Sequence, residues 1–360
     1  MQYHVTLFLC PGQDLWTSSQ VFTGLSELER NNVVTFETDC GAPLDPRFSS
    51  LIWLRVTQSG TGRTRTIVID LADSAECLSA IALESVALYF KRHYSAAALL
   101  QLPAAKRTRV WPFGFWMPCL NWSAMRHYSI SAFKVFLHPD SGSVCRRWSE
   151  HARQLVKNLS MLYGLPSSTT FATDPMRPRD LSVIFQTRLW RPEDNSAAPD
   201  VDKVNEERAN MVRSLRSAFR ERFVGGIVAD AYSRTFCPDA VVSAHTSRRA
   251  YIRRTQHALV GVFTRGLHDS LGFRLPEYLA AGVCIVSKAI QDVIPAPLAV
   301  DVHYKSYQSI NECISQCDYL LTHPDEAQRM RIANTKYYVE WCSPKQQMLL
   351  LLKRCFSDVQ

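Results

Sequence analysis

The first third of the chain alternates apolar, strand-like runs with polar turns. Runs rich in β-branched or aromatic residues predict strands at residues 3–9, 32–36, 51–56 and 66–71. Residues 75–94 carry apolar side chains at helical spacing and predict a helix. This alternation is typical of βαβ units and favours a parallel sheet.

The same alternation resumes after a polar stretch near residues 165–180, where we place an interdomain linker. A strand is predicted at 181–186 and a helix at 205–223, whose Arg and Glu side chains are interpreted as a solvated face. A basic helix is expected near residues 247–256. Strand–helix units on both sides of a linker predict an α/β protein with two domains, which leave a cleft for ligands.

The clearest pattern lies between residues 258 and 287. An apolar strand at 258–263 is followed by a loop, a helix at 275–281 that Gly282 ends, and a second buried strand at 283–286. Open α/β sheets bind ligands outside the carboxyl ends of their strands, which is where this loop is placed. Its arginines, Arg265 and Arg274, and the amides of the following helix suit a diphosphate, and Gly266 and Gly272 allow the backbone to approach one closely.

The composition favours one class of binding partner but does not identify a particular partner. Lys and Arg number 41 and Asp and Glu 33, so the net charge of +8 favours anionic partners. The 11 cysteines include no Cys-x-x-Cys pair, and the N-terminal residues lack the pattern of a signal peptide, so reduced thiols and a cytoplasmic location are expected. No run of apolar residues reaches membrane-spanning length.

No metal site and no cofactor are predicted. The sequence has no His-Glu-x-x-His pattern, and its one Asp-x-Asp, Asp200 and Asp202, follows a polar stretch instead of a buried strand. We interpret these two acids as a solvated pair or as a cap for the helix that follows.

Residues 269–287 resemble the nucleotide-sugar signature of GT-B glycosyltransferases. In that signature two acidic residues, separated by seven others, precede a small-residue helix, a glycine and a buried strand; here they are Asp269, in place of the usual Glu, and Glu277. The resemblance implies that Glu277 binds the donor ribose hydroxyls and that Asp269 lies near the donor sugar. It also implies that the loop amides, including those of Ser270 and Leu271, hold the diphosphate.

The likeness extends beyond this signature. Arg274 stands shortly before the motif Glu, as in exostosin-like members, and the strand at 181–186 with Arg188 and Arg191 is similar to the strand and basic loop that open a GT-B C-terminal domain. The implied fold is GT-B, with two Rossmann-like doubly wound domains facing a central cleft. Residues 1–170 would bind the acceptor and residues 171–342 the nucleotide sugar, and a helix within residues 343–360 would cross back to the first domain.

The identity of a catalytic base stays open. An inverting transfer to a hydroxyl is helped by a base from the acceptor domain. Asp14 and Asp70 follow predicted strands and are the favoured candidates, beside Asp73, His93 and His127. A retaining enzyme would not need such a base, and the sequence does not fix the stereochemistry.

The expected function is metal-independent transfer of a sugar from a UDP- or GDP-sugar to a hydroxyl of a glycan, a glycolipid or another acceptor. One alternative is a non-catalytic binding protein of the same fold. Another is a glycosyltransferase that acts on modified nucleic acid, which only the net charge favours. Peripheral contact with an anionic membrane is a further alternative, because the segment at 247–254 is basic.

Overall fold

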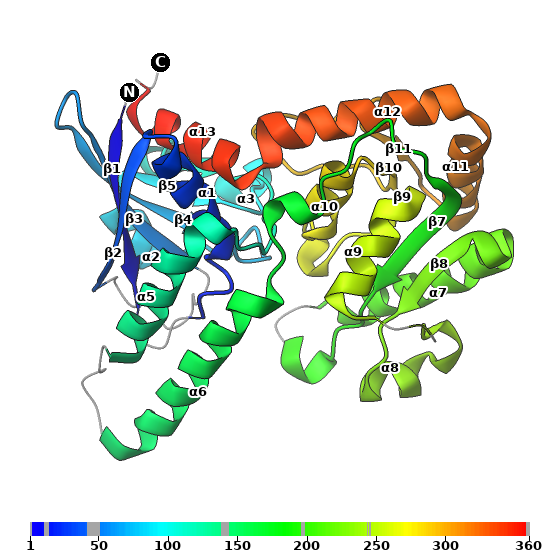
Figure 1. The fold of residues 1–360 in the computed structure, drawn as a ribbon, viewed down its shortest axis with the longest axis horizontal. Coiled ribbons are helices and arrows are strands. Elements are labelled where there is room, and N and C mark those ends of the chain that lie inside the picture. Colours follow the sequence, from blue (N-terminus) through cyan, green and yellow to red (C-terminus); the bar gives the residue numbers. More distant parts are fainter. Residues whose placement is uncertain are drawn as a thin grey trace. The chain divides into compact units, whose positions relative to one another are not determined.

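The computed structural model describes residues 2–10, 14–41, 51–137, 144–195, 199–242, 244 and 246–357, without the side chains of residues 144–149. The chain divides into two compact units. Unit 1 comprises Met1–Ser168, Val293–Pro295 and Trp341–Gln360, and unit 2 comprises Thr169–Asp292 and Ala296–Glu340. Each unit is an α/β structure built around one sheet, as Figure 1 shows.

Unit 1 contains a six-stranded sheet in the order β2-β1-β3-β4-β5-β6. Its strands are β1 (Tyr3–Leu9), β2 (Val34–Cys40), β3 (Leu51–Gln58), β4 (Thr64–Asp70), β5 (Leu88–Lys91) and β6 (Val110–Pro112). The sheet is mixed, because β3 is antiparallel to both β1 and β4 while the other pairs are parallel. The purely parallel sheet expected from the sequence is therefore wrong for this unit. The physical reason is a tight hairpin between β3 and β4, in which Gly62 has φ +66° and its amide donates to the Gln58 carbonyl.

The predicted helix at residues 75–94 is also wrong. Only α2 (Ala80–Ser85) is helical there, and residues 88–91 form β5. The segment pairs in parallel with β4, from Ile67 opposite Leu88 to Asp70 opposite Lys91. Short apolar runs do not distinguish a helix from a buried strand, and pairing with β4 makes this segment a strand.

Helices cover the sheet of unit 1. They are α1 (Ser19–Arg30), α2, α3 (Ala96–Leu99), α4 (Ala104–Arg107), α5 (Met125–Leu137), α6 (Val144–Gly164) and α13 (Pro344–Phe356). The last of these, from the far end of the chain, packs on α1 and contributes Met348, Leu351 and Leu352 to the core of the unit (Figure 1).

Unit 2 contains a five-stranded parallel sheet in the order β11-β10-β9-β7-β8. The strands are β7 (Asp180–Thr187), β8 (Phe223–Ile227), β9 (Ala258–Phe263), β10 (Cys284–Ser287) and β11 (Tyr304–Ser306). The helices are α7 (Val201–Phe219), α8 (Ala231–Phe236), α9 (Arg248–His257), α10 (Arg274–Ala281), α11 (Ile310–Thr322) and α12 (Pro324–Tyr337). The doubly wound pattern expected for the second half is observed here.

The pattern read at residues 258–287 is confirmed in detail. The predicted strand is β9, and α10 ends at Gly282, which adopts the left-handed conformation with φ 59° and ψ 42°. A side chain at Gly261 would stand 2.8 Å from the Tyr278 ring, so this glycine lets α10 lie directly on β9.

No described helix is both long and apolar enough to cross a bilayer.

Candidate functional site

The loop between β9 and α10 is held in an unusual backbone conformation. It contains a short 3₁₀ turn, Leu267–Asp269, in which His268 and Asp269 have φ of 55° and 57°. Non-glycine residues rarely adopt this left-handed region. The Gly266 amide closes the loop by donating to the Ser270 carbonyl at 2.8 Å, and a side chain at Gly266 would stand 3.0 Å from Ser270 Oγ. The loop therefore has a defined shape.

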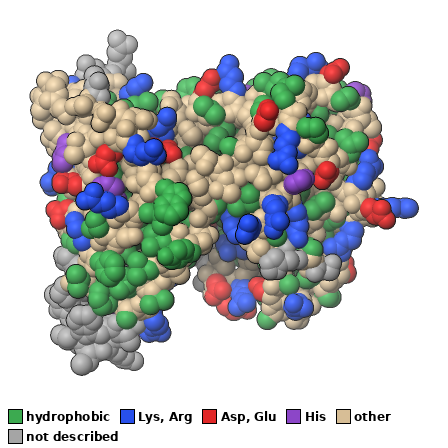
Figure 2. All heavy atoms as spheres, viewed as in Figure 1, with side chains coloured by type: hydrophobic (Ala, Val, Ile, Leu, Met, Phe, Trp, Pro, Cys, Tyr) green, Lys and Arg blue, Asp and Glu red, His purple; other side chains and the backbone are tan. Residues whose placement is uncertain are grey.

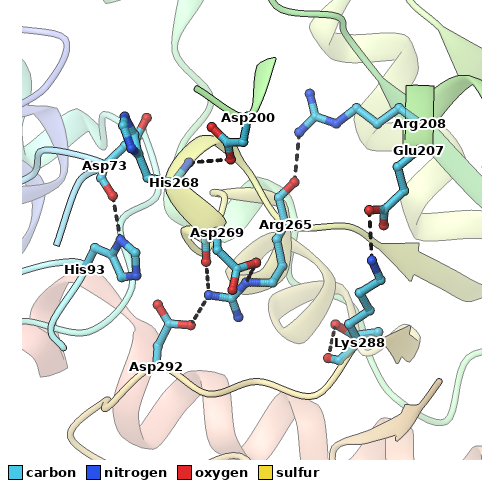
Figure 3. Close-up of polar contacts among 11 residues, drawn as sticks. Asp73, His93, Asp200, Glu207, Arg208, Arg265, His268, Asp269, Lys288 and Asp292 are labelled. Atoms are coloured by element: carbon cyan, nitrogen blue, oxygen red, sulfur yellow. Dashed lines mark hydrogen bonds and ion pairs between the residues drawn. The ribbon is translucent and has the colours of Figure 1, made fainter. Parts of the chain in front are cut away.

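This loop forms one wall of a cavity of about 390 Å³ within unit 2. The other walls come from the first turns of α7 and from the residue after β10, so the cavity lies outside the carboxyl ends of β9 and β10. Its charged lining residues are Asp200, Lys203, Glu207, Arg208, Arg265, Asp269 and Lys288. Figure 3 shows how several of these side chains converge from the three segments.

Carboxylates connect the walls of this cavity through a hydrogen bond and an ion pair. Asp200 Oδ2 accepts a hydrogen bond from the His268 amide at 2.9 Å, and Lys288 pairs with Glu207 at 2.8 Å (Figure 3). The sequence-based interpretation of Asp200 as a solvated acid or helix cap is corrected, because it precedes α7 without capping it and holds the loop instead.

Arg265 is neutralised by two acids. Its Nε lies 2.5 Å from Asp269 Oδ1, and its guanidinium also lies 2.6 Å from Asp292 Oδ2. Asp269 is largely exposed, with 70% of its side chain accessible, whereas Asp292 is buried. Because two carboxylates compensate its charge, Arg265 orders the loop (Figure 3).

Three other arginines gather where β7 ends. The buried Arg208 donates to the carbonyls of Arg188 at 2.7 Å and Arg265 at 3.2 Å, and Arg274 Nη1 lies 3.4 Å from Thr187 Oγ1. In the described part of the chain, none of the side chains of Arg188, Arg208 and Arg274 forms an ion pair with a carboxylate. Among the described residues of unit 2, no carboxylate therefore lies within ion-pair distance of these three side chains.

The arginines repel one another. Burial, followed by the charges of Arg274 and Arg188, lowers the pKa of Arg208 to about 9, and burial followed by Arg274 lowers the pKa of Arg188. A bound anion would relieve both the repulsion and the loss of hydration. The electrostatics of this cluster therefore favour a negatively charged ligand.

Glu277 lies in the interior of unit 2. Every residue from Leu275 to Ala281 is buried, and Glu277 has no accessible surface. Its Oε1 pairs with Arg248 of α9, and its Oε2 has no hydrogen-bond partner among the described residues. The basic helix α9 thus directs one of its arginines, Arg248, toward this buried carboxylate.

The remaining loop and strand candidates differ in their surroundings. Ser270 is buried, and Leu271 and Gly272 are half-buried in the same loop. Arg191 lies apart from the cluster, since it approaches Asp230 at 3.6 Å and nearly half of its side chain is exposed. The structure therefore brings Arg188 and Arg274 together and leaves Arg191 outside.

Asp70 is not available as a base. Its side chain has no accessible surface, and Oδ2 accepts from Tyr89 at 2.5 Å and from Lys91 at 2.8 Å while Oδ1 accepts from the Ala72 amide. A carboxylate buried among three donors cannot reach a substrate proton, so its role in unit 1 is structural.

Asp14 and the two histidines have different partners. Asp14 pairs with Lys157 of α6 at 2.7 Å. His127 pairs with Glu29 at 2.8 Å, and the half-buried His93 places Nδ1 2.5 Å from the carbonyl oxygen of Asp73 (Figure 3). Of these side chains, only His93 has a ring nitrogen whose hydrogen bond to a backbone carbonyl fixes its tautomer.

Sequence reasoning missed the contribution of α7 to the cavity. Arg208 was assigned to a solvated face, yet it is only 5% exposed. A signal was present, since Arg208 lies three and seven positions before the buried Met211 and Leu215 and so interrupts an apolar stripe. No sequence pattern indicated Lys288, because it reaches the cavity only through its position directly after β10.

Within the described residues, no group of three or more His, Cys, Asp or Glu side chains could hold a metal ion.

Comparison with known proteins gives one family match. Residues 208–340 match the family model described as glycosyl transferase-like. No curated protein matches the chain.

Several solved structures are similar at low identity. The C-terminal domain of a glycosyl transferase group 1 family protein (LpcC) from Francisella tularensis has 9% identity and a TM-score of 0.35, over 48% of this chain and 95% of that one. An α1,3-fucosyltransferase has 10% identity and a TM-score of 0.42, over 98% and 91%. An α-glucosyltransferase in complex with UDP-glucose and DNA containing an abasic site has 8% identity and a TM-score of 0.42, over 96% and 99%. Through the family match at residues 208–340, the protein carries a glycosyltransferase domain and is assigned as a transferase enzyme.

Proposed function

We propose that the protein transfers a sugar from a nucleotide diphosphate sugar to a hydroxyl acceptor, and that unit 2 binds the donor. The observation that carries this proposal is the cluster of Arg188, Arg208 and Arg274, which no carboxylate in the described part of unit 2 neutralises. The cluster stands at the carboxyl end of β7, beside the N-terminus of α10. A diphosphate leaving group carries the charge that such a cluster attracts.

The N-terminus of α10 supports the same placement. No side chain caps it, and helix N-termini attract phosphate through their amides and dipole. Because guanidinium groups and a helix terminus already supply positive charge, we propose that transfer needs no divalent metal ion. Activity that persists in excess chelator is the expected result, and its loss would contradict this part of the proposal.

Glu277 would bind the donor ribose. Its Oε1 is engaged by Arg248, whereas its Oε2 is buried without a partner in the described residues. A buried carboxylate oxygen that lacks a donor is unfavourable by about 1–3 kcal/mol, and a ribose hydroxyl would remove that penalty.

Thermal stabilisation by UDP, GDP and inorganic diphosphate tests the donor site. A ligand that binds only the folded state raises the melting temperature, so the nucleoside diphosphates are expected to do so and CMP, which lacks a diphosphate, to do so less. Arg188→Gln and Arg274→Gln should each weaken UDP or GDP binding about tenfold or more, because each loses a charge-assisted hydrogen bond. Arg253→Gln is the matched control, since Arg253 is exposed on α9.

Inorganic diphosphate separates the two parts of the site. It has no ribose, so Glu277→Gln should weaken UDP or GDP binding and leave diphosphate binding unchanged. Equal loss for both ligands would contradict the ribose assignment. If folded Arg188→Gln and Arg274→Gln variants bind UDP or GDP as tightly as the unmodified protein does, the proposed donor site is wrong.

The acceptor is proposed to be a hydroxyl of a glycan, a glycolipid or another molecule bound by unit 1. Turnover of a UDP- or GDP-sugar distinguishes this proposal from a non-catalytic binding protein. DNA binding that weakens steeply with salt would instead favour action on nucleic acid.

A peripheral membrane contact is favoured by one surface of unit 1. Exposed apolar side chains recur on one stripe of α5, at Ile130, Phe133 and Leu137, and on α6, at Val156 and Tyr163. Figure 2 shows hydrophobic side chains gathered over these helices. We therefore propose that this face rests on a lipid surface in the cytoplasm.

Vesicle sedimentation tests this contact. The protein should sediment with phosphatidylglycerol vesicles, and replacing Phe133 and Tyr163 by Ser should reduce the bound fraction several-fold because it removes buried apolar area. Ile332→Ser on α12 is the control, because Ile332 is also an exposed apolar side chain but lies in unit 2. Equal binding by both variants would contradict the proposal.

A further inference from the structure

Unit 1 has a large apolar cavity that the donor site does not use. Its volume is about 700 Å³, within the range of small-molecule sites. Phe90 and Tyr94 line it at the end of β5, Trp111 and Phe113 at β6, and Ile294 and Leu351 close it. The cavity therefore lies at the carboxyl ends of two adjacent parallel strands, the position at which α/β sheets bind ligands.

Three polar atoms in this lining have no hydrogen-bond partner among the described residues. They are Arg107 Nε, Trp111 Nε1 and Gln347 Oε1. Gln347 is only 4% exposed, and its Nε2 donates to the Cys342 carbonyl at 2.8 Å, which fixes the side chain. Gly114, with φ +102°, keeps the space beside this amide open, since a side chain there would stand 3.2 Å from Pro295 and 3.5 Å from Gln347 Oε1. Buried polar atoms without partners in an apolar cavity indicate a ligand with a polar group.

The charged part of the lining has one sign. Arg107 and Arg354 line the cavity, and no Asp or Glu is among its lining residues in the described part of the chain. The Arg354 guanidinium lies 3.2 Å from the centroid of the Trp111 ring. Burial lowers the pKa of Arg354, as expected for a cation without a nearby acid. An anionic group on the ligand would complement both arginines.

We propose that this cavity binds a monomeric amphipathic carboxylate. Its apolar body would lie between the aromatic walls, and its carboxylate would accept hydrogen bonds from Arg354 and Arg107. The proposal concerns unit 1 alone and does not depend on the transferase reaction, because the binding is measured without any sugar donor.

Isothermal titration with dodecanoate and dodecanol, both as monomers, tests the proposal. Dodecanoate should bind at least about tenfold more tightly than the uncharged alcohol, since a hydrogen bond to a charged group is worth about 1.5–3 kcal/mol. The double variant Arg107→Gln with Arg354→Gln should abolish this preference and leave dodecanol binding unchanged. Arg109→Gln, an exposed arginine outside the cavity, should behave like the unmodified protein.

A cavity-filling variant locates the binding. Leu350 is half-buried in the lining, and Leu350→Trp should abolish the binding of both compounds while the melting temperature shows that the protein is folded. Failure of dodecanoate to bind would overturn the proposal. So would binding that Leu350→Trp does not change, or binding seen only with fatty-acid vesicles and not with the monomer.

Discussion

At the scale of single residues, the neighbours of a polar side chain decide what chemistry it retains. A backbone carbonyl only accepts hydrogen bonds, so the contact between the Asp73 carbonyl and His93 Nδ1 places the proton on Nδ1. His93 follows β5, a parallel strand at whose carboxyl end functional side chains are expected, and we propose that it is the general base of the transfer.

Replacement of His93 tests this role. His93→Gln should lower kcat about 10²–10⁴-fold with little change in the KM for the donor, because a general base contributes about that much to the rate. His127→Gln, at a histidine paired with Glu29, is the control. An unchanged kcat in folded His93→Gln would contradict the role of His93 as the base.

Single residues also show what the sequence alone could not predict. Asp70 and Glu277 stand where a functional acid is expected, yet the first is enclosed by Tyr89, Lys91 and Ala72 and the second is paired with Arg248. Tyr89 and Lys91 come from β5 and Arg248 from α9, so these partners come from other segments of the chain than the acids that they contact. Sequence spacing gives the position of an acid on its own strand or helix and does not give the donors that surround it.

At the scale of elements, the contact between α1 and α13 depends on Gly24. A side chain at this position would overlap the Pro344 carbonyl oxygen and lie 2.6 Å from Met348 Cγ. Gly24→Ala should therefore destabilise the protein by about 1–3 kcal/mol, although alanine favours a helix, because the backbone of α13 would have to move. Denaturant unfolding measures this change.

Gly60→Ala provides the comparison for Gly24→Ala. Gly60 lies in the turn between β3 and β4, and a methyl group added there would have no neighbouring atom within 4 Å. This variant should change the free energy of unfolding by less than about 0.5 kcal/mol. Equal effects of the two variants would contradict the packing role of Gly24.

Elements were predicted best where periodicity and end signals agreed. The strand β9, the helix α10 and Gly282 follow from an apolar run, a helical spacing and a glycine that adopts φ 59°. The antiparallel direction of β3 and the existence of the strand β5 were missed, because strand direction and pairing depend on contacts with β1 and β4.

At the scale of the whole molecule, the sequence predicted an α/β protein with two strand–helix assemblies, because alternation of elements is a property of the chain itself. It also predicted the loop of the candidate site, since the end of a parallel strand is a local position. The side chains that complete the cavity come from α7 and from the end of β10, and only the folded sheet brings them to that loop.

Unit 2 is in effect inserted into unit 1, since the chain leaves unit 1 at Ser168 and returns for its last helix at Trp341. During synthesis, the hydrophobic face of α1 cannot receive Met348 and Leu352 until α13 has emerged from the ribosome. Unit 2 can fold first, although domains usually fold in the order in which they are made. A fragment of residues 1–340 should accordingly leave unit 1 accessible to proteases while unit 2 is already protected.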